Sequence, residues 1–215
     1  GAKALSLRAK QEGWDVLAML NYDMVGSSRN RAGDYDPHQI RVFSEESAHH
    51  HSRELARILE WNGRNQTVWP KLVFRKDRYG RGGDHSPFNV QGFTAVRFVE
   101  CHEEYAHQHT PEDLPENMDF DYLAGVATLT GHLLRLLSAS GPQPSNVRVT
   151  RAPGRKTLVE WDGDGPCQVY WRETTSPSWE HALPAEGGQA HIEADIDDHI
   201  FGVGSHPAGI PIVAQ

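Results

Sequence analysis

The sequence is poor in the features that mark specialised classes of protein. Only two of its 215 residues are cysteine, Cys101 and Cys167, and their separation fits neither a disulfide framework nor a zinc knuckle. No apolar run approaches the length of a membrane-spanning helix. Basic charge is not in excess, because 21 Lys and Arg stand against 29 Asp and Glu, for a net charge of −8. We therefore expect a globular protein with two unpaired thiols and without a nucleic-acid or membrane partner.

The first part of the chain alternates helical and strand patterns. Strands that alternate with helices indicate an α/β fold with a mostly parallel sheet, covered by helices on both faces. Ser44 has the character of an N-cap, followed by acidic residues in the first helical turn. The expected segments are a helix over residues 2–11, a buried strand over 15–25, a loop over 26–38, a helix over 45–61, a strand over 93–100 and a helix from Phe120 to Leu137 that ends before Gly141.

The pattern changes after residue 140. Short strand-like runs follow one another, punctuated by Gly, Pro and Asp, and no helical pattern appears. Such a series is typical of a small antiparallel β-sandwich. We therefore predict an α/β domain over residues 1–140, a linker over 141–146 and an all-β domain over 147–215.

Asp23 is the first candidate for a functional residue, in the stretch LNYDMVGS. It ends a run that otherwise reads as a buried strand, and a buried ionised carboxylate is costly unless it is paired or binds a metal. The carboxyl end of a parallel strand is also where open α/β sheets bind ligands. The alternative is an aspartate that caps the loop after the strand.

A second group of candidates lies in the stretch HQHTPED. His107 and His109 could each offer an imidazole nitrogen to zinc, and Asp113 could orient a ligand histidine through a hydrogen bond. The alternative is that the histidines are solvated in an exposed loop.

A third group follows two glycines in the stretch RGGDHSPF. Asp84 and His85 could support a ligand or contact a substrate, or they could be a polar pair in water. We expect no helix directly after the GRGG stretch at 80–83, and so no phosphate site. The three histidines at 49–51 fall in the first half of the predicted helix, where adjacent side chains point in different directions and cannot close on one ion.

Taken in order, the motifs NYDMVG, GGDHSPFNVQGFTAV and HTPEDLPENMDFDYLAGV resemble the C-terminal part of zinc aminopeptidases of the bacterial leucyl aminopeptidase type. Glutamate carboxypeptidase-like and glutaminyl cyclase-like proteins are relatives of this family. The resemblance covers about residues 1–138 and implies a three-layer α/β/α sandwich. It also implies a site with two zinc ions, in which Asp23 binds one ion and His109 the other. His107 is the alternative ligand, and Asp84, His85 and Asp113 are supporting or substrate-contacting residues.

The resemblance implies residues that this sequence does not contain. The family's site also needs an upstream His, a bridging Asp and a Glu-Glu pair, of which the first Glu is the general base. We therefore expect no catalytic residue within these 215 residues, and expect the chain to be an inactive fragment of an aminopeptidase that acts on peptides. The alternative is a peptidase-like scaffold or binding protein without catalytic activity.

The last segment resembles a fibronectin type III domain. Trp161 in LVEWDG and Tyr170 in VYWRET match core positions of that domain, and core packing is the ordinary role of such aromatic residues. The resemblance implies a module that contacts a protein or polysaccharide surface. It also implies a secreted or periplasmic enzyme, although no signal peptide is present in this sequence.

Overall fold

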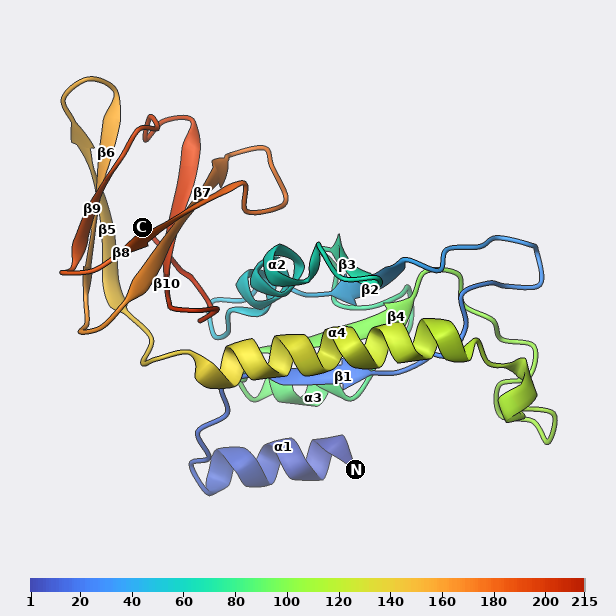
Figure 1. Cartoon of the computed structure of the whole chain (residues 1–215). Coiled ribbons are helices and arrows are strands. Elements are labelled where there is room, and N and C mark those ends of the chain that lie inside the picture. Colours follow the sequence, from blue (N-terminus) through green and yellow to red (C-terminus); the bar gives the residue numbers. More distant parts are fainter. Residues whose placement is uncertain (215) are drawn as a thin grey trace. The chain divides into compact units, whose positions relative to one another are not determined.

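The computed structural model describes residues 1–214, which form two compact units (Figure 1). The first unit is Gly1–His132 and the second is Leu133–Gln215. The division falls inside the long helix α4, which spans Phe120–Ala139.

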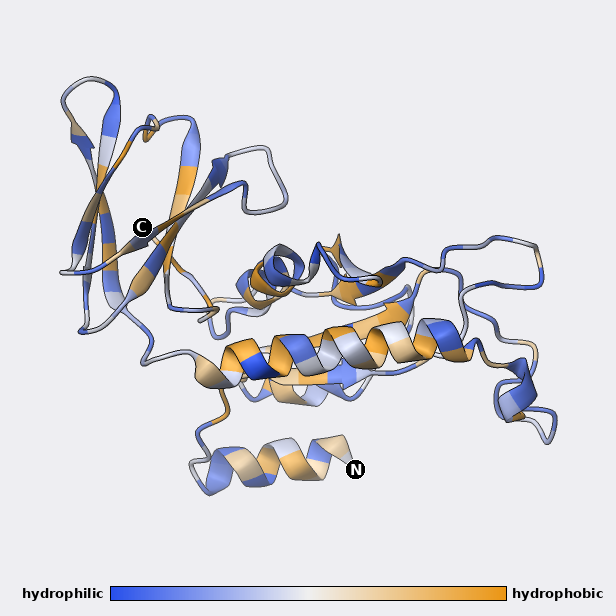
Figure 2. Ribbon diagram, viewed as in Figure 1, coloured by the Kyte–Doolittle hydropathy of each residue, from blue (hydrophilic) through white to orange (hydrophobic). Residues whose placement is uncertain are grey.

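The first unit is built on a four-stranded mixed sheet. Its strands are ordered β1, β4, β2, β3, with bounds Met19–Tyr22, Ala95–Glu100, Gln39–Phe43 and Trp69–Val73. The β1–β4 and β2–β3 pairs are parallel, whereas β2 and β4 are antiparallel. Every residue of β4 is buried, and the strands of this sheet are mostly orange in Figure 2. The predicted α/β fold with a mostly parallel sheet is confirmed, with one antiparallel pair that was not expected.

Helices lie on both faces of this sheet. In Figure 1, α2 (Ser52–Gly63) lies above the sheet and α3 (His85–Val90) below it, with α1 (Ala2–Gln11) beneath α3. Helix α4 packs closely against α2, since a Cβ added at Gly63 would lie 2.9 Å from a methyl carbon of Leu129. A 3₁₀ turn, η1 (Pro115–Asn117), precedes α4. The predicted helices over 2–11 and from Phe120 onward are confirmed.

The helix predicted over residues 45–61 begins later than expected. Strand β2 reaches Phe43, Ser44 is fully buried, and its backbone N–H donates to the Val73 carbonyl at 3.1 Å. Ser44 is therefore not the N-cap, a position that His51 takes instead. The three histidines at 49–51 thus precede helix α2, and the prediction that they lie in its first half is wrong.

Two further predictions, about residues 15–25 and about the segment after residue 83, are wrong. The buried strand predicted over 15–25 is only the four residues Met19–Tyr22, of which Asn21 alone is buried. A helix does follow the GRGG stretch, because α3 begins at His85. Strands β2 and β3 were not predicted.

Residues 133–214 of the second unit form seven strands in two antiparallel sheets. One sheet is ordered β5, β6, β9 and the other β11, β10, β7, β8. Trp161 is 3% exposed within the hydrophobic core, and Tyr170 is also buried. The strand bounds are Ser145–Ala152 (β5), Lys156–Asp162 (β6), Cys167–Glu173 (β7), His181–Ala185 (β8), Gln189–Ile192 (β9), His199–Ser205 (β10) and Ile212–Val213 (β11). The assignment to the fibronectin type III fold stays a prediction.

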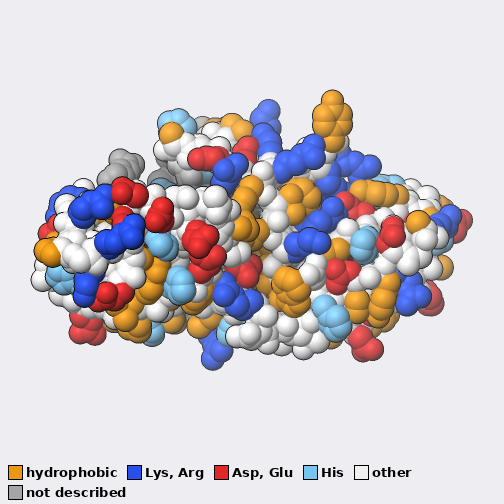
Figure 3. Space-filling view, turned by 90° about the horizontal axis from the view of Figure 1, so that it is seen from above, with side chains coloured by type: hydrophobic (Ala, Val, Ile, Leu, Met, Phe, Trp, Pro, Cys, Tyr) orange, Lys and Arg blue, Asp and Glu red, His pale blue; other side chains and the backbone are white. Residues whose placement is uncertain are grey.

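The charged surface and the two thiols were the features that the composition addressed. Acidic, basic and histidine side chains are interspersed on the face drawn in Figure 3. Cys101 and Cys167 are both free thiols, as predicted. Within residues 1–214, no helix combines the length and the apolar character needed to cross a membrane.

Candidate metal centre

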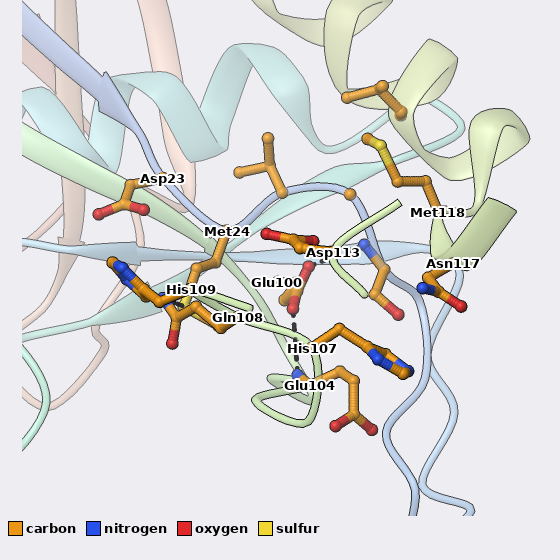
Figure 4. Close-up of a pocket in the computed structure, with 14 residues that line it drawn as sticks. Asp23, Met24, Glu100, Glu104, His107, Gln108, His109, Asp113, Asn117 and Met118 are labelled. Carbon is orange, nitrogen blue, oxygen red and sulfur yellow. Dashed lines mark hydrogen bonds between the residues drawn. The ribbon is translucent and has the colours of Figure 1, made fainter. Parts of the chain in front are cut away.

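A cavity of about 490 Å³ opens where β1 and β4 end (Figure 4). Its volume is within the range usual for sites that bind small ligands. The stretches LNYDMVGS and HQHTPED both contribute to it, so two segments far apart in the sequence meet here. The lining residues are Asp23, Met24, Val25, Gly26, Ser27, Glu100, Glu104, His107, Gln108, His109, Asp113, Asn117, Met118 and Leu123.

Asp23 lies directly after β1, where its backbone N–H donates to the Phe98 carbonyl of β4 at 3.2 Å. Its side chain is 48% exposed, so the expectation of a buried carboxylate is wrong. The strand is shorter than predicted, and Asp23 emerges from it into the cavity. Its Oδ2 accepts a hydrogen bond of 2.7 Å from Nη2 of Arg97. The carboxylate is therefore paired on one side and open to the cavity on the other.

Two residues of the cavity wall have an unusual backbone conformation. Met24 has φ of 59° and His109 has φ of 62°, in the left-handed region that side chains other than glycine rarely adopt. Such conformations cost free energy and concentrate at functional sites. Both lie at the candidate ligand positions, one next to Asp23 and the other at His109 itself.

His109 and His107 point in different directions. In Figure 4 the imidazole of His109 lies toward the same side of the cavity as Asp23, whereas that of His107 points to the opposite side. Nε2 of His107 lies 3.4 Å from Nη2 of Arg31, a cationic neighbour that disfavours a second cation. Of the two histidines, His109 is better placed to share the cavity with Asp23.

Glu100 is a lining residue that sequence reasoning missed. It ends β4 and is 3% exposed, and its carboxylate accepts hydrogen bonds from the backbone N–H groups of Ser27 at 2.8 Å and Glu104 at 3.3 Å. Burial raises the pKa of Glu100 to about 7, although these N–H groups stabilise its ionised form. Glu100 thus ties the loop after β1 to the loop after β4. Its position as a charged residue at the end of the apolar stretch FTAVRFVE could have identified Glu100 from the sequence.

The three supporting candidates are not brought together. Asp113 is exposed and lines the cavity, but among residues 1–214 no hydrogen bond joins it to His109. Asp84 is exposed and His85 is completely buried, and neither lines the cavity. Nε2 of His85 lies 2.9 Å from the Lys76 carbonyl, to which it can donate a hydrogen bond. Neither Asp84 nor His85 therefore contributes to the cavity wall.

The cavity has the donor types that a zinc ion needs but not a complete set. Its lining holds four carboxylates and two imidazoles, and none of the described lining residues is Lys or Arg. Oxygen and nitrogen donors of this kind suit zinc. However, within residues 1–214 no group of three or more His, Cys, Asp or Glu residues is arranged to hold a metal ion. The chemistry of Asp23 and His109 fits zinc, and their number is too small for a closed site.

The first part of the chain is similar to a known peptidase family. Residues 1–134 match the model of "Peptidase family M28". A Leptosphaeria maculans protein described as a probable zinc metalloprotease is 31% identical, in an alignment that covers 95% of this chain and 56% of the relative. A similarly described Pyricularia oryzae protein is 34% identical, in an alignment that covers 89% of this chain and 46% of the relative.

The chain spans about half the length of the curated relatives it matches. Among solved structures, the LapA aminopeptidase of Legionella pneumophila has a TM-score of 0.48 and 20% identity, with 62% of this chain and 34% of that chain covered. Because the family model covers all of the first unit and more than half of the sequence, this chain belongs to peptidase family M28.

Proposed function

We propose that this chain is part of a zinc-dependent aminopeptidase, with Asp23 and His109 as ligands of two different zinc ions. The observation that carries the proposal is that both residues line one cavity, although they belong to separate segments of the chain. The relatives described as zinc metalloproteases support the choice of metal.

The charge of the cavity favours a substrate with a free amino group. Besides the proposed ligand Asp23 and the hydrogen-bonded Glu100, the acidic Glu104 and Asp113 line it, and none of its described lining residues is basic. A substrate carboxylate would find no cationic partner among them, whereas an ammonium group would. This difference supports an aminopeptidase over a carboxypeptidase.

The residues of this chain would position the ions and shape the cavity. When bound, zinc supplies an activated water and polarises a carbonyl group. Asp23 offers a carboxylate oxygen at the end of β1, and His109 offers an imidazole on the same side of the cavity. Glu100 holds the two loops together through its contacts with Ser27 and Glu104.

Two ligands do not complete a two-zinc site, because each catalytic zinc needs about three protein ligands. We propose that the remaining ligands and the general base come from residues outside this sequence. Two observations support this proposal. Residues 1–214 bring no three possible ligands together, and the relatives are about twice as long as this chain.

The test uses the complete natural protein and the variant Asp23→Ala. We expect zinc content to fall by about one ion per molecule and hydrolysis of peptides with a free N-terminus to be lost, because one ion loses a ligand. N-terminally acetylated peptides are expected to resist the unaltered enzyme. Zinc is measured by atomic absorption and hydrolysis by release of the first residue.

Asp34→Ala is the matched control, since Asp34 is exposed in the loop after β1 but does not line the cavity. It should change neither zinc content nor activity. If Asp23→Ala kept full activity and full zinc content, the ligand assignment would be wrong.

The second candidate function is a scaffold without catalytic activity. One observation favours it: Asp23 is half exposed and already paired with Arg97, so burial does not force it to bind a metal. A complete protein that binds no zinc and cleaves no peptide would support this second function.

A further inference from the structure

Arg97 is a charged residue in the interior of the first unit, in the middle of β4. Its side chain is 1% exposed. Nη2 donates to Oδ2 of Asp23 at 2.7 Å, and Nη1 donates to Oδ2 of Asp77 at 2.9 Å and to the Gly82 carbonyl at 3.0 Å. A buried guanidinium is stable only where such partners surround it.

The two carboxylates that flank Arg97 differ in their surroundings. Asp77 is 1% exposed, whereas the side chain of Asp23 is 48% exposed. Burial by itself would raise the pKa of Asp77, but a hydrogen bond from the Arg78 backbone and the positive charge of Arg97 lower it. Asp77 thus anchors the guanidinium inside the protein, and Arg97 extends from this anchor to the cavity.

The glycine-rich loop is shaped to admit this guanidinium. A Cβ added at Gly83 would lie 2.7 Å from Nη1 of Arg97, and the Gly82 carbonyl is one of the acceptors. The buried ion pair therefore gives a physical reason for Gly83, the second glycine in RGGDHSPF, a stretch that contributes no residue to the cavity.

We propose that Arg97, anchored by Asp77, is a positioning residue that holds Oδ2 of Asp23 and leaves Oδ1 as the one oxygen offered to a metal ion. This inference rests on the proposed function, in which Asp23 is a zinc ligand. Hydrogen-bonded partners of this kind fix the orientation of metal-binding carboxylates. Arginine suits the role because its planar fork presents separate nitrogens to the two carboxylates, whereas lysine carries a single ammonium group.

The test compares variants of the complete natural protein. Arg97→Lys keeps the charge but loses the fork, and Asp77→Asn weakens the anchor. Asp23→Ala is the reference for loss of the ligand. Arg57→Lys is the matched control, because Arg57 is also a buried arginine, 8% exposed and paired with Glu54, in helix α2 rather than at the cavity.

Three readouts separate positioning from a purely structural role. They are the zinc dissociation constants by chelator competition, the visible spectrum of the Co²⁺-substituted protein, and the melting temperature without metal. We expect Arg97→Lys and Asp77→Asn to weaken binding of one ion by about 10- to 100-fold and to alter the Co²⁺ bands. Arg57→Lys should lower the melting temperature without changing either metal readout.

The outcomes distinguish failure of this inference from failure of the proposed function. If Asp23→Ala releases one ion while Arg97→Lys and Asp77→Asn keep both dissociation constants and the Co²⁺ spectrum, the positioning role is wrong and the ligand assignment stands. If Asp23→Ala changes no metal readout, the proposed ligand itself is wrong. If Arg97→Lys does not fold, Asp77→Asn decides alone, since unchanged zinc affinity in that variant overturns the inference.

Discussion

His85 lies wholly inside the first unit, although its neighbour Asp84 is exposed. Its Nε2 can donate to the Lys76 carbonyl, and among the described residues no partner is found for Nδ1. Burial lowers the pKa of His85 below its ordinary value, although the hydrogen bond to Lys76 opposes this change. The folded protein therefore holds this imidazole in its neutral form.

This burial predicts a pH dependence of stability. As the pH falls below about 6.5, the unfolded chain binds a proton at His85 before the folded chain does, so the contribution is complete above that pH and is lost as the pH falls toward the lower pKa of the folded state. The loss reaches at most about 1.4 kcal/mol for each pH unit. Urea unfolding of the wild type and of His85→Gln checks this, and the free-energy difference between them should shrink from about pH 7 to about pH 5. A difference that stays constant over this range would contradict the prediction.

A charged residue inside an apolar stretch indicates a functional or paired position, and only one of three such residues was identified from the sequence. Asp23 was identified because it ends a strand-like run, and it does line the cavity. The same argument applies to Arg97 and Glu100 within FTAVRFVE, yet both were missed. Their partners Asp77 and Ser27 come from distant segments, and no local pattern shows that contact.

Helix α4 has two glycines whose surroundings differ sharply. A Cβ at Gly125 would lie 2.5 Å from Cγ2 of Val68, whereas a Cβ at Gly131 would meet no atom within 4 Å. Both lie in the interior of the same helix, so alanine should improve helix propensity at each. Only at Gly125 does the added methyl group collide with a packed side chain.

Gly125→Ala should therefore destabilise the first unit by about 1–3 kcal/mol, the usual cost of overpacking. Gly131→Ala, the matched control, should stabilise it by up to about 1 kcal/mol. The double variant Gly125→Ala with Val68→Ala should recover part of the loss, because the shorter side chain makes room. Thermal unfolding of the four proteins measures this, and equal effects of the two glycine variants would show that the contact with Val68 does not matter.

The strands and helices that could be predicted are those with long, regular patterns. The fully buried β4 and the helices over 2–11 and from Phe120 have such patterns. Strands β2 and β3 were missed because they are short and carry Arg41, and Pro70 with Lys71. Pro70 itself was informative, since proline within a sheet favours an edge strand, and β3 lies at the edge.

The two units have separate cores, so a change in one should not disturb the chemistry of the other. Trp161 is 3% exposed in the core of the second unit, and the candidate ligands belong to the first. Trp161→Ala should destabilise the second unit by about 3–5 kcal/mol. In the complete natural protein it should leave the zinc content unchanged, as measured by atomic absorption after calorimetry. Loss of zinc in a protein whose first unit remains folded would contradict this independence.

The peptidase family could be predicted from the sequence because its motifs occur in a fixed order, and the match of residues 1–134 to peptidase family M28 confirms the family. The narrower assignment to the bacterial leucyl aminopeptidase type stays a prediction. The substrate and the complete set of metal ligands could not be predicted from this sequence. Two of the expected ligands lie in this chain, and residues 1–214 do not bring three or more possible ligands together. A metal site draws its ligands from several distant segments, and this chain spans about half the length of its relatives.

The position of Pro70 limits how the first sheet can grow. The backbone N–H of Trp69 donates to the His38 carbonyl on the side of β2, so the ring nitrogen of the next residue, Pro70, faces the outer edge. A backbone carbonyl of a strand that docked there would find no hydrogen-bond donor at Pro70, because proline has no N–H. Strand β1, at the other edge, has no proline in Met19–Tyr22. A strand added beyond β3, whether from the rest of the natural protein or from another chain, would therefore lose one ladder hydrogen bond at Pro70, whereas a strand added beyond β1 would lose none to proline.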